Sequence, residues 1–224
     1  YDTNNKEGYF TQNSKINYDK RIIEGDSLTF NDAIQFASAT KNIIITDTIN
    51  NSIIKGNYAE VFKSIDSAMI TKKPYAIKVF DNDSLFIKAD TLFAIGPDFN
   101  RIIKGRFNVK FFRQNLTGKS DKIIINDKSG ITKLLRNEID KKELQILTNE
   151  EITKKNPVIW IGKSQMSGDE IQIIRELKTN SLDSLKILNN AFIIEKDSIG
   201  IENFNQMKGI NLYGKFVDNE LQKI

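Results

Sequence analysis

Four aspartates recur at comparable places along the chain and are its first candidates for chemistry: Asp26, Asp90, Asp121 and Asp169. Paired carboxylates carry out the acid–base work of glycoside hydrolysis, and repeated acidic loops bind Ca²⁺. Each of the four, however, follows a small residue at a predicted bend. Asp is favoured at bends because its side chain accepts hydrogen bonds from local backbone N–H groups. The sequence therefore favours a structural role for them.

Other catalytic chemistry finds little support in the residues. The chain has 224 residues with no Cys and no His, which removes thiol nucleophiles, thiolate metal ligands and the commonest general base. It contains no Gly-rich phosphate loop and no Gly-x-Ser-x-Gly, and a Ser-His-Asp triad cannot form. Trp160 is a candidate platform for stacking a sugar, although an aromatic residue in an alternating strand more often packs. The sequence predicts a protein that is not an enzyme, with no cofactor and no metal.

The aspartates belong to a repeat in which a small residue and a polar residue precede an apolar one. The small residues lie 31, 33, 31, 48 and 41 positions apart. They are Gly25, Gly56, Ala89, Ser120, Gly168 and Gly209. Five of the six copies have Ile or Met two positions earlier. A repeat of this length indicates one supersecondary element stacked on itself, each copy burying what its neighbour exposes.

Most of the chain has the pattern of β-strands. β-branched and aromatic residues alternate with polar ones, and clusters of Asn, Asp, Gly and Ser separate them. Strands are predicted at 42–49, 76–80, 84–94, 108–112, 122–126, 158–162, 170–174, 184–188, 191–195 and 211–216. Turns are predicted at 50–51, 81–83, 126–130, 189–190 and 218–219. No apolar run approaches the roughly 20 residues that a membrane-spanning helix needs.

The phase of the apolar residues changes at the small residue of the repeat. Leu85 and Ile87 share one face of a strand, whereas Leu92 and Ala94 alternate in the opposite phase. A strand that keeps its apolar side inward must therefore bend or bulge at Ala89, where a small residue is tolerated. Each copy of the repeat is predicted to turn a corner from one wall of a flattened β-structure to the other.

One stretch departs from this pattern. Between residues 131 and 156 the spacing of the repeat increases and the apolar residues show a partial helical period. We predict an irregular or helical insert there. A plain excursion of the chain explains it more simply than a functional element does. The net charge of +4 is spread among acidic residues, so it permits an anionic partner but does not form the concentrated basic face of a nucleic-acid-binding protein.

Several segments resemble the repeats of the OstA/LptA-like family of lipopolysaccharide-transport proteins. They are residues 85–92, 108–112 running into 116–121, 166–171 and the closing 207–216. The Ile-, Lys- and Asn-rich style resembles the OstA-like proteins of Bacteroidota in particular. The resemblance covers nearly the whole chain, and Tyr1-Asp2 resembles the tail of a preceding repeat. We therefore expect one elongated domain over 1–224, truncated at its N-terminus, with the insert at 131–156.

The resemblance implies an all-β fold, a twisted open antiparallel β-jelly roll built from strand–corner–strand units, with an apolar groove along it. It also implies a periplasmic protein, associated with the outer membrane, that carries lipopolysaccharide or its lipid A part. Such domains join other OstA/LptA-like proteins, or copies of themselves, by pairing their edge strands. The expected edges are residues 21–30 and 206–216.

The groove-lining residues are then those that point inward on both sides of each corner. They are Ile23, Leu28, Ile54, Val61, Ile87, Leu92, Ile123, Ile125, Met166, Ile171, Met207 and Leu212. A filled core would use the same residue types, so two alternatives stay open. One is a structural β-solenoid scaffold with a filled core and no ligand. The other is a carbohydrate-active β-enzyme with two close carboxylates near Trp160.

Overall fold

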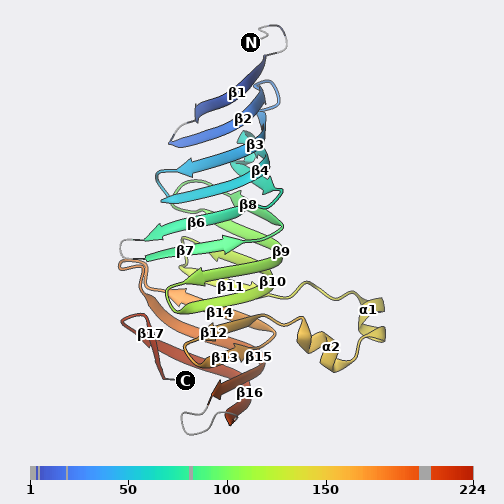
Figure 1. Ribbon diagram of the computed structural model, residues 1–224, viewed down its shortest axis with the longest axis vertical. Coiled ribbons are helices and arrows are strands. Elements are labelled where there is room, and N and C mark those ends of the chain that lie inside the picture. Colours follow the sequence, from blue (N-terminus) through green and yellow to red (C-terminus); the bar gives the residue numbers. More distant parts are fainter. Residues whose placement is uncertain (1–3, 5, 19, 81–82, 197–202, 224) are drawn as a thin grey trace. The chain divides into compact units, whose positions relative to one another are not determined.

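The protein is described by a computed structural model over residues 4, 6–18, 20–80, 83–196 and 203–223. Its secondary structure is almost entirely antiparallel β-strand, which confirms the predicted all-β class (Figure 1). In these ranges the helices are α1 (Lys141–Ile146), α2 (Asn149–Lys154) and the 3₁₀ turn η1 (Lys63–Ile65). None of them is long and apolar enough to cross a membrane. The N-terminal tail expected at Tyr1-Asp2 lies outside the described residues.

Contacts within the chain group it into two compact units. The first contains residues 1–107 and 126–128, and the second contains residues 108–125 and 129–224. The single domain expected over 1–224 stays a prediction, and each unit is described by itself below.

The first unit is a series of antiparallel strands. They are β1 (Glu7–Tyr18), β2 (Arg21–Asn31), β3 (Phe36–Asp47), β4 (Ser52–Phe62), β5 (Ser67–Thr71), β6 (Tyr75–Phe80), β7 (Asp83–Lys88), β8 (Thr91–Ile95) and the start of β9 (Ile102–Arg113). β1 to β4 pair in sequence order, and β4 then pairs with both β5 and β6. The sequence did not predict β1. Because β1 pairs with β2, the first edge strand is β1 and not the expected residues 21–30.

The second unit repeats this arrangement. After the end of β9 its strands are β10 (Leu116–Asn126), β11 (Ile131–Leu135), β12 (Val158–Ile161), β13 (Ser164–Ser167), β14 (Glu170–Arg175), β15 (Leu182–Lys196), β16 (Phe204–Val217) and β17 (Glu220–Lys223). β15 pairs with both β13 and β14, while β11 pairs with β14 and β12 with β13. β11 and β12 therefore correspond to two halves of one long strand, and so do β13 and β14.

The predicted corners occur where the small residues lie. The register between β2 and β3 shifts at Gly25-Asp26, and the strand predicted at 84–94 breaks into β7 and β8 at Ala89-Asp90. At Gly168 the same break separates β13 from β14. A Cβ added at Gly168 would lie 2.5 Å from Ile187 Cγ2, so the small residue also allows close approach of the next strand.

The strands that neighbour these small-residue corners bend in a different way, which the sequence did not reveal. β3 crosses its corner with two successive left-handed residues, Lys41 (φ 56°) and Asn42 (φ 50°). β15 does the same at Asn189 (φ 56°) and Asn190 (φ 52°). The sequence predicted a turn between two strands at 189–190, but the structure has one bent strand there, because Asn adopts the left-handed conformation at low cost. For the same reason β3 begins before the predicted residue 42, at Phe36.

The corners divide the first unit into two walls with apolar inner faces. The first wall contains residues 21–24, 43–47 and 52–55 with β6 and β7, and the second contains residues 27–31, 36–40 and 58–62 with β5 and β8. The core consists of inward side chains from both walls, which include Ile23, Ile45, Ile54, Ile87, Leu28, Ala59, Ile70 and Leu92. The alternating burial along each strand is the period-2 pattern predicted from the sequence.

Candidate functional site

Most of the predicted groove-lining residues lie in the interior of their own unit. In the first unit Ile23, Leu28, Ile54, Ile87 and Leu92 are buried and Val61 is half-buried. In the second unit Ile123, Ile125, Met166 and Ile171 are buried, and Leu212 is half-buried. Met207 is 51% exposed on β16. Apart from Met207, these side chains are buried or half-buried, as either a groove or a filled core requires.

A cavity of about 40 Å³ separates the two walls of the first unit. Ile23, Ile45 and Ile54 of the first wall line it, together with Val61, Ala68 and Ala94 of the second. A water molecule occupies about 30 Å³ of liquid volume. The cavity therefore has room for about one water and not for an acyl chain.

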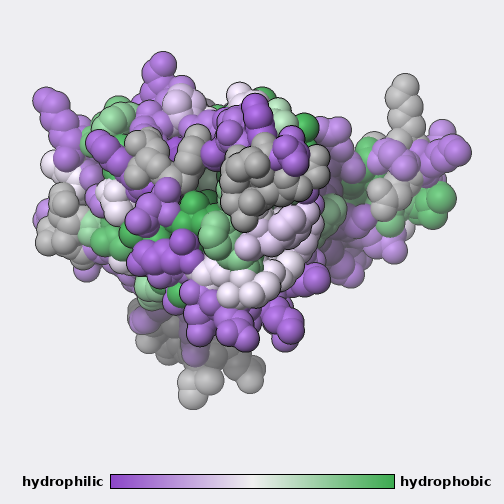
Figure 2. Space-filling model, turned by 90° about the horizontal axis from the view of Figure 1, so that it is seen from above, coloured by the Kyte–Doolittle hydropathy of each residue, from purple (hydrophilic) through white to green (hydrophobic). Residues whose placement is uncertain are grey.

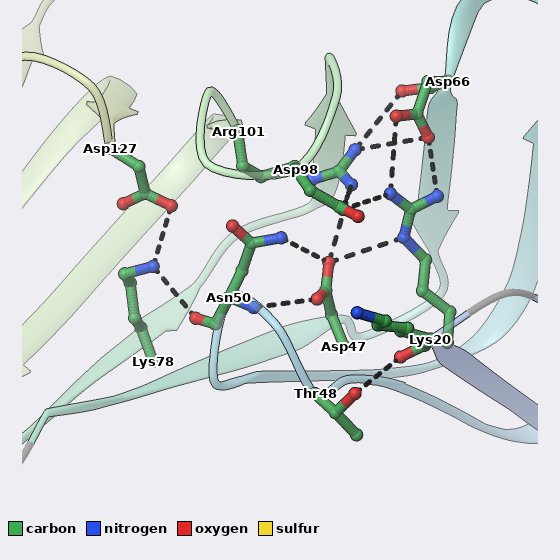
Figure 3. Close-up of polar contacts among 10 residues, drawn as sticks. Lys20, Asp47, Thr48, Asn50, Asp66, Lys78, Asp98, Arg101 and Asp127 are labelled. Atoms are coloured by element: carbon green, nitrogen blue, oxygen red, sulfur yellow. Dashed lines mark hydrogen bonds and ion pairs between the residues drawn. The ribbon is translucent and has the colours of Figure 1, made fainter.

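A network of buried and half-buried charged side chains lies at the polar side of this cavity (Figure 3). Arg21, at the start of β2, donates from Nη1 to Asp66 Oδ1 (2.6 Å) and from Nη2 to Asp98 Oδ1 (3.0 Å). Its Nε donates to Asp47 Oδ2 at 3.5 Å. Arg21 and Asp47 belong to the first wall, whereas Asp66 follows β4 and Asp98 follows β8 of the second. The network therefore joins the two walls.

Arg101, which precedes β9, is the most deeply buried member of this network. It is 3% exposed, and its Nη2 donates to Asp98 Oδ1 at 3.2 Å. Carboxylate oxygens of Asp47 and Asp66 each lie 3.5 Å from its guanidinium nitrogens. Its Nε is buried with no hydrogen-bond partner in the described part of the chain. Arg101 therefore retains an unused donor at the cavity that it lines.

Two further contacts hold the network in place. Asn50 donates from its backbone N–H and from Nδ2 to Asp47, at 2.9 and 2.8 Å. The buried Lys78 on β6 donates to Asp127 Oδ2 (2.8 Å) and to the Asn50 carbonyl (3.1 Å), as Figure 3 shows. The carboxylate of Asp47 is therefore fixed from the first wall alone, whatever happens at the second wall.

The balance of charge at this network favours ionised arginines. Burial lowers the pKa of Arg21, but the hydrogen bond with Asp66 and the charges of Asp66, Asp47 and Asp98 outweigh this effect, so its pKa is raised above the ordinary value. Because three carboxylates face two guanidinium groups, the loss of one aspartate still leaves each arginine with a carboxylate partner. These residues are distant in sequence and outside the repeat, so no sequence motif pointed to them.

Two of the motif aspartates, Asp26 and Asp169, have structural partners other than the predicted ones. Both carboxylate oxygens of Asp26 accept from Asn42 Nδ2, at 3.1 and 3.0 Å. In the second unit both oxygens of Asp169 accept from Asn190 Nδ2 at 3.1 Å. The bond therefore runs to the left-handed Asn of the neighbouring strand instead of the local backbone. It connects the two kinds of corner.

The predicted insert contains α1 and α2 and replaces a corner between β11 and β12 (Figure 1). Two motif aspartates hold its ends. Asp169 Oδ1 accepts from Arg136 Nη1 and from Asn156 Nδ2, both at 3.1 Å, and Asp121 Oδ2 accepts from the backbone N–H of Asn137 at 3.0 Å. Two of the corner aspartates thus attach the insert to the sheet.

Trp160 lies on the outer face of β12. Its Nε1 donates to Gln165 Oε1 at 2.9 Å, and Lys119 Nζ is 5.7 Å from the ring centroid. Across the described ranges, no group of three or more acidic side chains is placed to hold a metal ion. The polar contacts of Trp160 are those of an outward packing residue.

Comparison with solved structures identifies the fold. The chain is similar to the crystal structure of LptH, the LptA homologous periplasmic component of the lipopolysaccharide transport device from Pseudomonas aeruginosa. The TM-score is 0.51 at 13% sequence identity, over 63% of this chain and 94% of that one. No family model and no curated protein sequence matches the chain.

This likeness confirms the predicted LptA-like antiparallel β-jelly roll. At 13% identity it shows the fold alone, so the closer kinship with the OstA-like proteins of Bacteroidota stays a prediction.

Asp169 is expected to stabilise the protein more than Asp26, because it holds both a corner and the insert. Asp169→Ala should lower the free energy of unfolding by about 2–3 kcal/mol, since a charge-assisted hydrogen bond from Arg136 is lost. Asp26→Ala, which removes the bonds from Asn42, should cost about 1 kcal/mol. Urea unfolding measures both, and hydrogen exchange in α1 and α2 should accelerate only in the first variant. Equal losses in the two variants would contradict this role of Asp169.

Proposed function

We propose that this protein carries the acyl chains of lipopolysaccharide, or of its lipid A part, between its two walls. In this proposal it acts in the periplasm as one component of a bridge toward the outer membrane. The observation that supports it is the pair of apolar inner walls in an LptA-like fold. The similar protein LptH is itself a periplasmic component of a lipopolysaccharide transport device.

The physical task of such a carrier is to shield hydrocarbon from water. Each buried CH₂ group contributes about 0.8 kcal/mol, so an acyl chain leaving a membrane needs a continuous apolar path. The inward Ile, Leu and Met side chains supply apolar surface, while the anionic head stays near solvent and the scattered lysines. No catalytic step is needed for this transfer.

The small cavity of the first unit favours one alternative. A cavity of about 40 Å³ is what a structural scaffold with a filled core would have. A carrier with this interior must part its walls to admit a chain. Lipid capture at inward positions therefore distinguishes a lipid carrier from a structural scaffold.

Photo-crosslinking measures lipid capture directly. A photoreactive residue at Val61 or Ile87, which lie in the interior of the first unit, should label lipopolysaccharide. The same residue at Lys88, the exposed neighbour of Ile87, or at the outward Lys122 should not, because these side chains lie outside the walls. Circular dichroism shows whether each labelled protein keeps its strands. Equal labelling at inner and outer positions, or no labelling at any, would reject the carrier and leave the scaffold.

We also propose that the protein joins other LptA-like jelly rolls, or copies of itself, through its terminal strands. β1 pairs with β2, and β16 pairs with β15 and, over its last residues, with β17. Exposed aromatic and apolar side chains gather on both strands: Tyr9, Phe10, Phe204, Met207, Ile210, Tyr213 and Val217. Figure 2, viewed from above, shows apolar surface exposed among hydrophilic residues. Terminal strands of this kind recruit further strands.

Charges placed on these strands should weaken association. Phe10→Asp and Met207→Asp are each expected to raise the dissociation constant of self-association about tenfold, or about 1.4 kcal/mol. Sedimentation velocity over a concentration series measures the change. Phe99→Asp is the control, because Phe99 is exposed in the turn between β8 and β9. A monomeric wild type at all concentrations, or equal effects of the three substitutions, would count against pairing through these edges.

A further inference from the structure

The inner face of the first wall changes from apolar to charged at the strand ends farthest from the corners. Cross-strand neighbours form one polar row there, which consists of Arg21, Asp47, Ser52 and Lys78. Two residues closer to the corner, the next row is entirely apolar and consists of Ile23, Ile45, Ile54, Ala76 and Ile87. Both rows point inward, because side chains alternate with period two. The polar row, together with the charged residues of the second wall that pair with it, is called the clasp below.

The second wall contributes to the clasp from the loops at its own strand ends. These residues are Asp66 before β5, Asp98 and Arg101 between β8 and β9, and Asp127 after β10, whose backbone N–H donates to the Arg101 carbonyl at 3.1 Å. The pairs that join the walls are Arg21 with Asp66 (2.6 Å) and Asp98 (3.0 Å), Arg101 with Asp47 (3.5 Å) and Lys78 with Asp127 (2.8 Å), as Figure 3 shows. The first wall brings two cations and one carboxylate, and the second brings one cation and three carboxylates. The two sides of the clasp therefore attract each other.

Stability alone does not account for charges at this place. Taking charged groups out of water is costly, and replacing a buried ion pair by well-packed apolar residues often leaves stability unchanged or raises it. The side chains of Arg101, Lys78 and Asp127 are 4%, 8% and 10% exposed, so this cost applies to them. The cavity of about 40 Å³ borders the clasp, so the apolar packing of the walls is incomplete there. A filled core would be better served by apolar residues, whereas a closure that opens needs charges that water can accept.

The arginines of the clasp keep carboxylate partners when the walls separate. Arg21 retains Asp47 of its own wall at 3.5 Å. Arg101 retains Asp98 at 3.2 Å and Asp66 at 3.5 Å. The side chains of Asp66 and Asp98 are 33% and 25% exposed, so water already reaches them. Separation therefore leaves neither arginine without a counter-charge.

The lysine pair of the clasp divides in the same way. Lys78 retains the carbonyl of Asn50, to which it donates at 3.1 Å, and Asp127 stays bonded to Arg101 through its backbone N–H. Only the contacts between the walls are broken. At the corners, by contrast, the walls are joined by continuous chain. The walls can therefore part at the clasp and remain connected at the corners.

We propose that the clasp is a lateral entry to the first unit. Its ion pairs hold the walls together when no lipid is bound, and they separate when an acyl chain passes between the walls. The chain then lies against the apolar row behind the clasp, while its polar head stays in solvent. The inference rests on the proposed carrier function and adds the side from which the chain enters. A chain that entered past the terminal strands would not depend on the clasp.

Release of the clasp should speed lipid capture. Asp66→Asn combined with Asp98→Asn removes the carboxylates of the second wall that hold the first, while Asp47 continues to pair with both arginines. A photoreactive residue at Val61, which lines the cavity, reports the arrival of the chain. We expect lipopolysaccharide to label it several-fold faster in the released variant than in the wild type.

A readout without lipid shows whether the clasp itself has opened. Spin labels at Thr48→Cys and Ile65→Cys, on either side of the clasp, should show longer distances in the released variant than in the wild type. Asp26→Ala is the matched control, because it removes the bonds from Asn42 at a corner of the same unit. It should change neither the distance nor the labelling rate. An equal effect of Asp26→Ala would mean that general destabilisation, and not the clasp, admits the chain.

Locking the clasp should have the opposite effect. A bis-maleimide that joins Thr48→Cys to Ile65→Cys fastens the two walls beside the clasp, and labelling at Val61 should fall about tenfold or more. The same reagent joining Thr48→Cys to Lys88→Cys spans the first wall only and should leave labelling at the wild-type rate. Undiminished labelling in the protein locked at the clasp would overturn the lateral entry.

The two proposals fail in different ways. Labelling at Val61 that neither the released nor the locked clasp alters would keep the carrier and overturn the lateral entry. No labelling in any of these proteins, with a longer Thr48–Ile65 distance in the released variant, would overturn the carrier and the entry of a chain, and leave the ion pairs as a closure of the walls. An unchanged distance in the released variant would overturn the clasp itself.

Discussion

A strand that crosses from one wall to the other must keep its apolar side chains inward on both walls, and the remaining structure depends on how this is achieved. Because side chains alternate with period two, a plain bend would turn half of the apolar residues outward. One kind of strand shifts its register at a small residue, as at Gly25, and the next uses two left-handed residues, as at Asn189 and Asn190. Asp26 and Asp169 connect the two devices by accepting from the corner Asn of the adjoining strand. Two apolar walls with an interior between them follow.

The walls of the first unit are joined in two physically different ways. At the corners the connection is covalent and reinforced by the hydrogen bonds of the ladder. At the strand ends it depends on ion pairs of Arg21 and Arg101 with three aspartates, of which Asp66 and Asp98 are partly exposed. In the proposed carrier the walls of this unit must part at the ion-paired strand ends, since the corners join them covalently.

The sequence predicted the parts of the structure that arise from local patterns. Period-2 alternation predicted strands such as β6 and β12 but not β1, the phase change at Ala89 predicted the corner between β7 and β8, and the irregular spacing predicted the helical insert. The left-handed corners were missed because an Asn pair such as Asn189-Asn190 signals a turn and a strand bend equally well. The arginine–aspartate network was missed because its members, from Arg21 to Arg101, meet only in the folded unit. Whether the inward residues form a groove or a core could not be predicted, since both use the same side chains.

The central claim is that the walls of the first unit part when an amphiphile binds. The absence of Cys allows spin labels to be placed at Thr48→Cys, in the exposed turn beside Asp47, and at Ile65→Cys, exposed beside Asp66. Double electron–electron resonance between these labels measures the separation of the two walls at the strand ends, where the ion pairs join them. Addition of lipid A should shift the distribution to longer distances, and a second pair that spans one wall only, at Thr48 and Lys88, should not change. An unchanged Thr48–Ile65 distance at saturating lipid would contradict the account.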